Sequence, residues 1–408
     1  MKNSTLNDLS GCVEKTAAGF TLFLTVTLLF ITGSVTQAVA AEDIAEPRGI
    51  LELNSPETVL TVGGRINFSS YWNSPDGSFS AGGAPASKAG EDNELGIHLR
   101  NSRLWFNTRT PTEFGQIKTY IETDFYGSAG NEIATNGHAM RIRHAFFQLG
   151  GLTLGQNWST FQTYVSPDIL TDVAYIQWTR QPMARWSWDG EGLDYDLAIE
   201  QPETTLTDSS GGQVLPADDQ MPDIIARLRY DSDWGKTSAA IVLRNIRQSE
   251  ATLSDGTTQL TSTDQQSAWG VNLSAMFNVG EQDDARIGVI HGDGIGRYIA
   301  LNAYNAGTVN NAGEITLQSA TGGYAAYRHW WSNKLRSSFA YSVVSTENNL
   351  NVVPNSVNKE AYSYHINLLW TPFSDAQLGI EYAHLERQQE DSQTADMERL
   401  YIEIRYGF

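Results

Sequence analysis

Arginines occur in two short segments at a spacing that would let them act together. Arg141 and Arg143 flank one apolar residue, and Arg227 and Arg229 flank another. Side chains of an extended strand alternate between its two faces, so each arginine pair would project from one face, with an apolar residue on the other. Guanidinium groups present a planar fork of donors that fits carboxylate or phosphate, and they stay charged at any working pH. The spacing therefore predicts a surface that attracts small anions.

Pairing with nearby carboxylates is the alternative role of these arginines. Glu122 and Asp124 show the same two-residue spacing, so their carboxylates would also share one face of a strand. Ion pairs with them would make the arginines structural parts of a wall. The two roles are compatible, because opposed basic and acidic rows across a constriction make a transverse field that orients dipolar solutes.

Residues for other kinds of chemistry are scattered. None of the seven histidines lies in a nucleophile motif or forms a pair with metal-ligand spacing, and Cys12 is the only cysteine. No glycine-rich phosphate loop follows a strand and opens a helix. A net charge of −20 gives no electrostatic footprint for nucleic acid. We therefore expect no catalytic residues, no metal site, no cofactor and no nucleic-acid partner, and we expect that the protein is not an enzyme.

The N-terminus carries an export signal. Residues 17–35 form an apolar run, and Ala38 and Ala40 supply a small-residue cleavage site. We predict a signal peptide over 1–40 and a short periplasmic segment over 41–57; a retained signal anchor is the alternative. Cys12 lies in a sequence that is similar to a lipoprotein box, but it precedes the apolar run instead of following it, so we do not expect lipidation.

The last ten residues alternate between apolar and polar side chains. Leu400, Ile402, Ile404, Tyr406 and Phe408 fall on one face, and a period of two is typical of a strand with two unlike faces. A strand that ends the chain on an aromatic residue resembles the C-terminal signal by which outer-membrane barrels are assembled. We therefore expect Tyr406 and Phe408 to form an assembly signal for the barrel-assembly machinery.

Similar alternation recurs along 58–408, and the connections between the alternating segments sort into two kinds. Eight long polar segments alternate with seven tight turns, which separates sixteen strands. Bacterial outer-membrane barrels show this asymmetry of long and short connections. We predict an all-β fold, a sixteen-stranded antiparallel transmembrane β-barrel over 58–408, with Pro182 interrupting the sixth strand and shifting its alternation near Arg180. The long segments are roughly 73–94, 127–138, 158–174, 202–221, 248–265, 293–318, 347–358 and 389–395, and the turns are Arg109–Glu113, Gly150-Gly151, Asp189–Gly192, Ser232–Gly235, Gly280–Asp284, Trp331–Lys334 and Thr371–Asp375.

Alternation also assigns each charged side chain of a strand to the lipid or to the lumen, because a charge that faces lipid costs several kcal/mol (~2–4 for Arg or Lys near the midplane). The lumen would then be richer in basic than in acidic groups, and the acidity of the chain would be concentrated in loops and turns. The expected basic lining is Arg65, Arg103, Lys118, Arg141, Arg143, Arg185, Arg227, Arg229 and Arg244, and the facing acids are Glu122, Asp124, Asp194 and Asp196.

The third long segment, 158–174, is less polar than the others. Its Phe161, Tyr164 and Ile169 would be better placed inside a barrel than in water. We predict that this loop folds inward, which would place Asp168 and Asp172 opposite the arginine wall. The alternative is that the loop packs on a neighbouring subunit.

Several motifs over about 58–190 resemble the DcaP-like family of outer-membrane porins. They are the segments around Arg100–Thr112, Ile121–Phe125, Arg141–Phe146, Leu154–Phe161 and Arg180–Trp186. The resemblance implies a homotrimeric sixteen-stranded barrel that passes small organic anions, dicarboxylates above all, with Arg103, Arg109, Arg141, Arg143 and Arg185 in the pore or the barrel wall. Some members carry an N-terminal coiled coil, which the short, proline-containing 42–57 segment does not predict.

From these patterns we predict an outer-membrane porin for passive diffusion of small hydrophilic solutes, biased towards organic anions such as dicarboxylates. Its expected partners are outer-membrane lipid, lipopolysaccharide bridged to acidic loops by divalent cations, and further copies of itself. A substrate-specific channel is the closest alternative. A surface antigen or adhesin that acts through its loops is another, and a barrel enzyme would need His138 or His291 at the outer rim.

Overall fold

The computed structural model describes residues 57–75, 79, 93–128, 133–162, 164–175, 177–216 and 219–408. The expected signal peptide (1–40) and all but the last residue of the expected N-terminal segment (41–57) lie outside these residues. The barrel belongs to a compact unit that spans Glu57–Phe408. No helix in the described part of the chain is long and apolar enough to cross a membrane.

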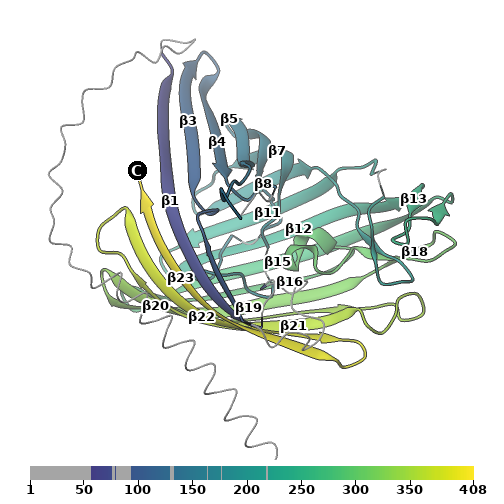
Figure 1. Ribbon diagram of the computed structural model, residues 1–408. Coiled ribbons are helices and arrows are strands. Elements are labelled where there is room, and N and C mark those ends of the chain that lie inside the picture. Colours follow the sequence, from purple (N-terminus) through teal and green to yellow (C-terminus); the bar gives the residue numbers. More distant parts are fainter. Residues whose placement is uncertain are drawn as a thin grey trace, which may run out of the picture. The chain divides into compact units, whose positions relative to one another are not determined.

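Sixteen antiparallel strands close into a barrel, which confirms the predicted fold class and strand number. The second strand is divided into β2 and β3, and both pair with β1, which on its other edge pairs with β23 and so closes the ring (Figure 1). The strands of the wall are β1 (Val59–Ser74), β2 (Glu94–His98), β3 (Arg103–Thr112), β4 (Gly115–Asp124), β5 (Arg141–Leu149), β6 (Leu152–Trp158), β7 (Arg180–Trp188), β8 (Leu193–Glu200), β11 (Asp223–Ser232), β12 (Gly235–Gln248), β15 (Asp264–Val279), β16 (Asp283–Asp293), β19 (Ser319–Ser332), β20 (Leu335–Glu347), β21 (Asn358–Trp370), β22 (Ala376–Gln389) and β23 (Thr394–Gly407).

The long and short connections lie where the alternation placed them. A tight turn joins each pair of strands at one end of the barrel, for example Gly150-Gly151 between β5 and β6, and the long loops join them at the other, which we call the loop end. Four short strands of the fourth and sixth loops form a separate sheet. They are β9 (Leu206–Thr207), β10 (Gln213–Val214), β17 (Gly307–Val309) and β18 (Ile315–Leu317), while β13 (Ala251–Thr252) pairs with β14 (Gln259–Leu260) in the fifth loop.

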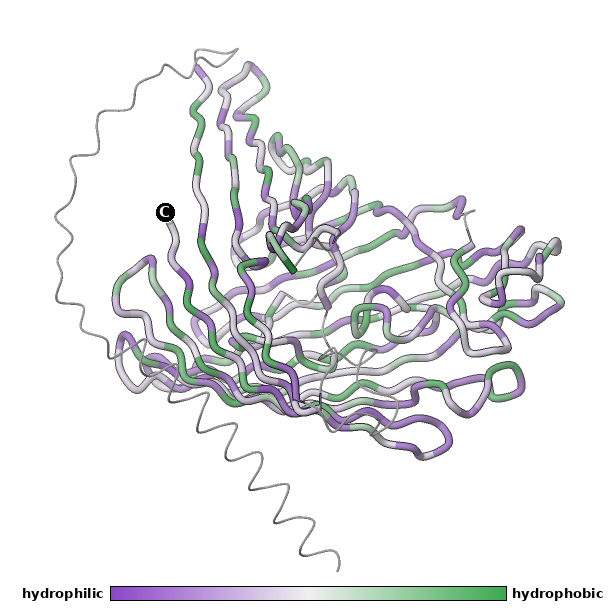
Figure 2. Tube along the Cα trace, viewed as in Figure 1, coloured by the Kyte–Doolittle hydropathy of each residue, from purple (hydrophilic) through white to green (hydrophobic). Residues whose placement is uncertain are grey.

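Side chains alternate between the outer face and the lumen along each strand of the wall. On β22, Gln377, Glu381 and Arg387 are buried inside the barrel, and residues of the opposite parity, such as Leu378 and Ile380, are partly exposed. Figure 2 shows the matching alternation of hydrophobic and hydrophilic residues along the strands. The outer face carries exposed aliphatic and aromatic side chains such as Leu228 and Trp370, as a strand that faces lipid requires.

The predicted interruption at Pro182 is wrong. β7 keeps an unbroken register with β6 across Pro182, so the strand is not interrupted there. The irregularity lies in β5 instead, where the register against β4 shifts between Glu122 and Thr123. Proline at 182 is tolerated because β7 pairs with β8 only from Met183 on, so its missing N–H lies at the end of that ladder. The β5 bulge, by contrast, turns two successive residues, Arg143 and His144, into the buried interior.

Candidate functional site

The third loop (159–179) runs through the lumen and is hydrogen-bonded to the barrel wall. The Glu381 carboxylate on β22 accepts hydrogen bonds from the backbone N–H groups of Leu170 at 2.6 Å and Thr171 at 2.9 Å. The Asn367 amide on β21 donates to the carbonyl oxygen of Asp168 at 2.9 Å. The backbone N–H and C=O groups of an irregular segment have no partner strand, so these polar side chains of the wall form their hydrogen bonds instead.

Further wall residues hold the loop on both sides of this point. The hydroxyls of Ser363 and Ser342 accept from the backbone N–H groups of Ala174 and Tyr175, each at 2.9 Å. The Tyr324 hydroxyl donates to the carbonyl of Val165 at 2.6 Å. These partners lie on β19 to β21, so the predicted inward fold of the third loop is confirmed.

The sixth loop also enters the barrel, which the sequence analysis did not predict. It contains two short 3-10 turns, η1 (Gly296–Tyr298) and η2 (Ala300–Asn302), and Ile295, Tyr298 and Ile299 are fully buried. The Tyr298 ring packs edge-on against Phe161 of the third loop, with ring centroids 5.3 Å apart, and its hydroxyl donates to Asp223 at 2.7 Å. The apolar residues at 295, 298 and 299 were the available signal, hidden in an otherwise Asn/Gly/Ala-rich segment.

Three successive non-glycine residues of this loop adopt left-handed backbone angles: Ala300, Leu301 and Asn302, with φ of 49°, 52° and 63°. Leu301 is half exposed, so it gains little from burial while it adopts a conformation that costs ~1–2 kcal/mol for a side chain with a Cβ.

We expect Leu301→Gly to raise the free energy of unfolding by about 0.5–1 kcal/mol. Urea unfolding of the purified barrel measures it, and Leu350→Gly, at an equally exposed site without positive φ, should be neutral or destabilising. A Leu301→Gly variant less stable than the parent protein would contradict the inference that the backbone at Leu301 is strained.

A cluster of three arginines and two carboxylates lines the β3–β5 wall. Arg141 is bound bidentately to Asp124, at 3.0 Å and 2.6 Å. Arg143 donates to Glu122 at 2.6 Å and Asp124 at 2.9 Å, and Arg103 donates to Glu122 at 3.1 Å. The pairing alternative is therefore realised here, yet the cluster retains one positive charge beyond its carboxylates.

A second cluster lies on β8 and β11. Arg227 and Arg229 both bind Asp196, at 2.9 Å and 3.1 Å, and Arg229 also approaches Asp194 at 3.4 Å. Their guanidinium groups are mostly buried in the wall. Charges balance in this cluster, so it orders the wall without adding net charge to the lumen.

Arg244 on β12 has a structural role. It binds Asp223 at 3.1 Å and donates to the carbonyl oxygens of Gly294 at 2.7 Å and Glu203 at 2.8 Å. Its side chain is only 1% exposed, so it fastens the fourth and sixth loops and offers nothing to a passing solute.

Three arginines on β1 and β7 form no hydrogen bond or ion pair with any residue that the structure describes: Arg65, Arg180 and Arg185. Each has a buried guanidinium nitrogen without a partner, and Arg180 stacks on the Trp158 ring at 4.6 Å. Lys118 and Arg109 are exposed near the turn end of β3 and β4. These three arginines put unpaired positive charge on β1 and β7, and Arg387 on β22 likewise has no partner among the described residues.

Asp168 was predicted as a lumen charge, but several others were missed, among them Arg328 and Arg336, although their inward-facing parity along the strands could have revealed them. Asp168 of the third loop binds Arg336 at 2.6 Å and Arg328 at 3.4 Å, on β20 and β19. Burial acts to raise the pKa of Asp168, but the hydrogen bond and charge of Arg336, and then the charge of Arg328, hold it below its ordinary value. The other missed charged side chains are Glu200, Arg286, Asp284, Glu381, Arg387, Arg399, Glu403 and Arg405.

Around the ring, the part of the wall that binds Asp168 lies opposite the β3–β5 cluster. β5 is the fourth strand and β19 the twelfth of sixteen, so half the circumference separates them. Asp168 thus lies on the far side of the lumen from Arg141 and Arg143, where its charge is matched by arginines of that wall.

Asp172 forms no hydrogen bond or ion pair within the described part of the chain. Burial raises its pKa to about 6, and the charges of Arg399 and His365 oppose this shift. The carboxyl is therefore ionised above pH 6 and neutral below it, and its protonation removes a negative charge from the lumen. We expect the chloride-over-potassium permeability ratio to rise as pH falls from 7.5 to 5 and to fall again as pH rises.

Reversal potentials in a dilute KCl gradient, where screening is weak (Debye length ~10 Å at 0.1 M), measure this pH dependence. Asp172→Asn should show the low-pH ratio already at pH 7.5 and should lose this step. The same pH step in the variant as in the parent protein would assign the titration to another group.

The C-terminal residues close the barrel. Phe408 and Gly64 exchange two backbone hydrogen bonds, at 2.9 Å and 3.0 Å, and the Tyr406 side chain is exposed on the outer face. A Cβ at Gly64 would lie 2.5 Å from the end of the Phe408 ring, so a larger residue here would displace that ring. Recognition of Tyr406 and Phe408 by an assembly machinery stays a prediction.

A closed, lipid-facing antiparallel barrel with a charged lumen and an inward third loop defines a transmembrane channel protein of the bacterial outer membrane. A family model described as "Porin subfamily" matches residues 56–401, most of the chain. The chain therefore belongs to this porin family.

Relatives and solved structures agree with this assignment. Porin Omp2b of Brucella suis is 29% identical over 210 residues, which cover 47% of this chain and 55% of the relative; the chain thus spans about half the length of the curated relatives it matches. The outer membrane channel DcaP of Acinetobacter baumannii has the same fold, with a TM-score of 0.74 at 19% identity, over 88% of this chain and all of that one. An anion-selective porin from Comamonas acidovorans superimposes with a TM-score of 0.54 at 10% identity, over 86% of this chain and all of that one. The resemblance to DcaP-like porins is confirmed.

Proposed function

We propose that this barrel is a diffusion pore that prefers small organic anions, dicarboxylates among them. The observation that carries the proposal is the set of unpaired arginines in the lumen, Arg65, Arg180 and Arg185. They supply positive charge that no described carboxylate neutralises by an ion pair.

The position of the third loop strengthens this effect. From Val165 to Tyr175 the loop is hydrogen-bonded to β15–β22 and to the sixth loop. Arg65, Arg180 and Arg185 lie on β1 and β7, so they line a part of the wall to which this loop segment is not hydrogen-bonded. Low-permittivity walls focus the field of such charges into the aqueous passage. Guanidinium forks additionally fit carboxylates in pairs of hydrogen bonds.

Current in a planar bilayer with a KCl gradient tests the proposal. We expect a reversal potential on the anion side and faster liposome swelling with succinate than with a neutral solute of equal size. A cation-selective or non-conducting barrel would overturn it. Succinate current that saturates while chloride current does not would favour the second candidate, a substrate-specific channel.

We further propose that the barrel is a homotrimer. β6 and β8 have 7 and 8 residues, below the ~9–11 that a tilted strand needs to cross the bilayer, whereas β12 and β15 have 14 and 16. A neighbouring subunit on the short side would provide the cover that this wall lacks, and a similar barrel, OmpT of Vibrio cholerae, is described in a trimer form. Native mass spectrometry in detergent tests the subunit number.

The remaining parts of the proposal concern the cell envelope. The chain would be exported through its 1–40 signal peptide and assembled through Tyr406 and Phe408. Its acidic loops would bind divalent cations that bridge lipopolysaccharide, because the net charge of −20 coexists with a basic lumen. Chelation of divalent cations should then weaken the binding of lipopolysaccharide to the purified protein.

A further inference from the structure

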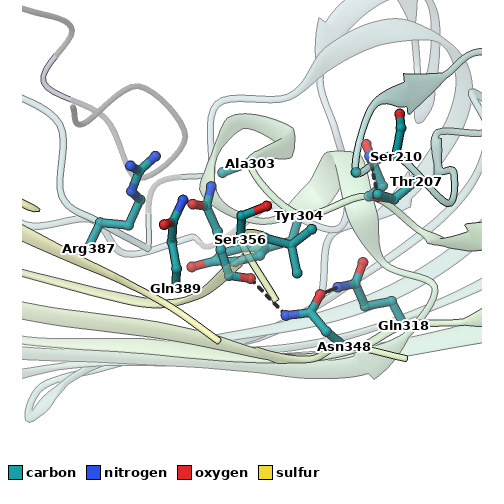
Figure 3. A pocket seen from close by; sticks show the side chains of 13 residues that line it. Thr207, Ser210, Ala303, Tyr304, Gln318, Asn348, Ser356, Arg387 and Gln389 are labelled. Carbon is teal, nitrogen blue, oxygen red and sulfur yellow. Dashed lines mark hydrogen bonds between the residues drawn. The ribbon is translucent and has the colours of Figure 1, made fainter. Parts of the chain in front are cut away.

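A cavity of about 270 Å³ opens near the loop end of the barrel, away from the β3–β5 cluster. Its lining residues come from β21, β22 and the fourth, sixth and seventh loops. Figure 3 shows Arg387 of β22 on one side and Thr207 and Ser210 of the fourth loop on the other. This volume is slightly below the ~300–1,000 Å³ typical of small-molecule sites. The cavity is therefore suited to a solute of few atoms.

Arg387 of β22 is the one charged side chain among the described residues that line this cavity. It is only 5% exposed, and its Nε and Nη2 atoms are buried without a hydrogen-bond partner. Those two N–H groups form the edge of the guanidinium that binds both oxygens of one carboxylate. A buried guanidinium without a counter-charge is unfavourable, so an arriving carboxylate would satisfy a group that the protein leaves unsatisfied.

Neutral polar groups also line the cavity. The Tyr304 hydroxyl is buried and has no partner, and burial raises its pKa above the ordinary value, so it remains a neutral donor at physiological pH. The Gln318 side chain donates to Asn348 at 2.6 Å, which leaves its buried Oε1 atom without a donor. Asn305 and Gln389 add further amides to the lining. Together they offer donors and acceptors to hydroxyl groups.

We propose that this cavity binds a small hydroxylated carboxylate, held by its carboxylate on the Nε–Nη2 edge of Arg387 and by its hydroxyls on Tyr304 and Gln318. This site goes beyond the proposed function: it is a saturable site near the outer mouth, separate from the charges that set the selectivity of the lumen. It would collect a solute before the solute reaches the third loop.

Isothermal titration of the full barrel in detergent with sodium gluconate tests the site, with glucose as the neutral probe. We expect gluconate to bind and glucose to bind at least about tenfold more weakly, because a charge-assisted bidentate contact is lost. Arg387→Gln should weaken gluconate binding about tenfold or more, and Arg387→Lys should not restore it, because an ammonium lacks the fork. Tyr304→Phe should weaken it about threefold to tenfold.

Lys359→Gln is the matched control. It removes one positive charge next to Asn358 from an exposed side chain that does not line the cavity, and gluconate should bind it within about twofold of the parent protein. Equal gluconate affinity in Arg387→Gln and the parent protein would overturn the site, and so would equal affinity for glucose and gluconate or no heat with gluconate up to ~10 mM. Heat-modifiable migration on a gel verifies that each variant is folded. If Arg387→Gln does not fold, the gluconate affinity of Tyr304→Phe tests the site instead.

Reversal potentials of the same preparations separate this site from the proposed function. A cation-selective barrel that binds gluconate through Arg387 would refute the pore selectivity and support the site. An anion-selective barrel without Arg387-dependent binding would refute the site alone.

Discussion

Glu381→Ala is expected to release the third loop from the wall and to raise the single-channel conductance. The Glu381 carboxylate is buried and accepts from Leu170, Thr171 and Asn367, so its removal leaves several buried donors of the loop and wall without an acceptor. Breaking a buried charged network costs roughly 3 kcal/mol. We therefore expect a lower unfolding temperature together with larger and noisier current steps.

Single-channel recording and thermal unfolding of one preparation measure both effects. Glu381→Gln, which keeps one acceptor oxygen, should lie between the parent protein and Glu381→Ala. Glu386→Gln on the same strand is the control, because its carboxylate bonds Tyr362 and not the third loop. Parent-like conductance of a folded Glu381→Ala barrel would mean that other contacts suffice to hold the loop.

The double variant Arg65→Gln/Arg185→Gln is expected to lose most of the anion preference. An unpaired charge about 10 Å from a passing ion contributes roughly 0.4 kcal/mol at the permittivity of water and about 1.7 kcal/mol at an effective permittivity of 20. The effect has opposite sign for the two ions, so losing two charges should lower the chloride-over-potassium permeability ratio by about fifteenfold at the permittivity of water in very dilute salt, and by less as salt screens the charges.

Reversal potentials in a dilute gradient measure this ratio. Lys334→Gln is the matched control, because it removes one charge from an exposed turn, where the ammonium bonds the Pro372 carbonyl. The permeability ratio should fall in the double variant and stay near the parent value in this control. The double variant should still show the pH step that we assign to Asp172. An unchanged permeability ratio would move the origin of selectivity to the paired clusters.

The paired clusters should respond differently from Arg65 and Arg185. Arg143 shares Glu122 and Asp124 with its neighbours, so Arg143→Gln would leave buried carboxylates short of a partner. Stability would then fall together with selectivity. Combined measurements of unfolding and permeability therefore separate arginines that hold the wall from arginines that act on solutes.

Much of the fold was predictable because the signals for a transmembrane strand are local. Alternation with a period of two needs only the neighbouring residues, as in Leu400 to Phe408, and the sorting of long and short connections needs only their lengths. Closure followed from the same pattern, since an unpaired edge cannot face lipid. The parity of Arg103, Arg141 and Arg143 was predicted in the same way, and all three lie in the predicted basic wall of the barrel.

Contacts between distant parts of the chain were not predictable. Thr171 meets Glu381 across 210 positions, and Arg336 meets Asp168 across 168. Nothing in the local pattern of 159–179 selects β19–β22 over any other part of the wall. The position of this loop on the wall depends on which carboxylate, amide and hydroxyl groups the strand register places at the same level along the barrel axis.

The sequence by itself determined a sixteen-stranded barrel, its inward loop and an arginine-rich lumen, because periodicity, segment length and apolar content are properties of short stretches of chain. Only the tertiary structure decided which arginines carry free charge. Arg143 and Arg65 look alike in the sequence, but the β5 bulge and the register of β4 bring two carboxylates to Arg143 and none into ion-pair distance of Arg65 among the described residues. Whether a lumen charge is neutralised depends on distances of a few ångströms between strands, and alternation along one strand carries no information about them.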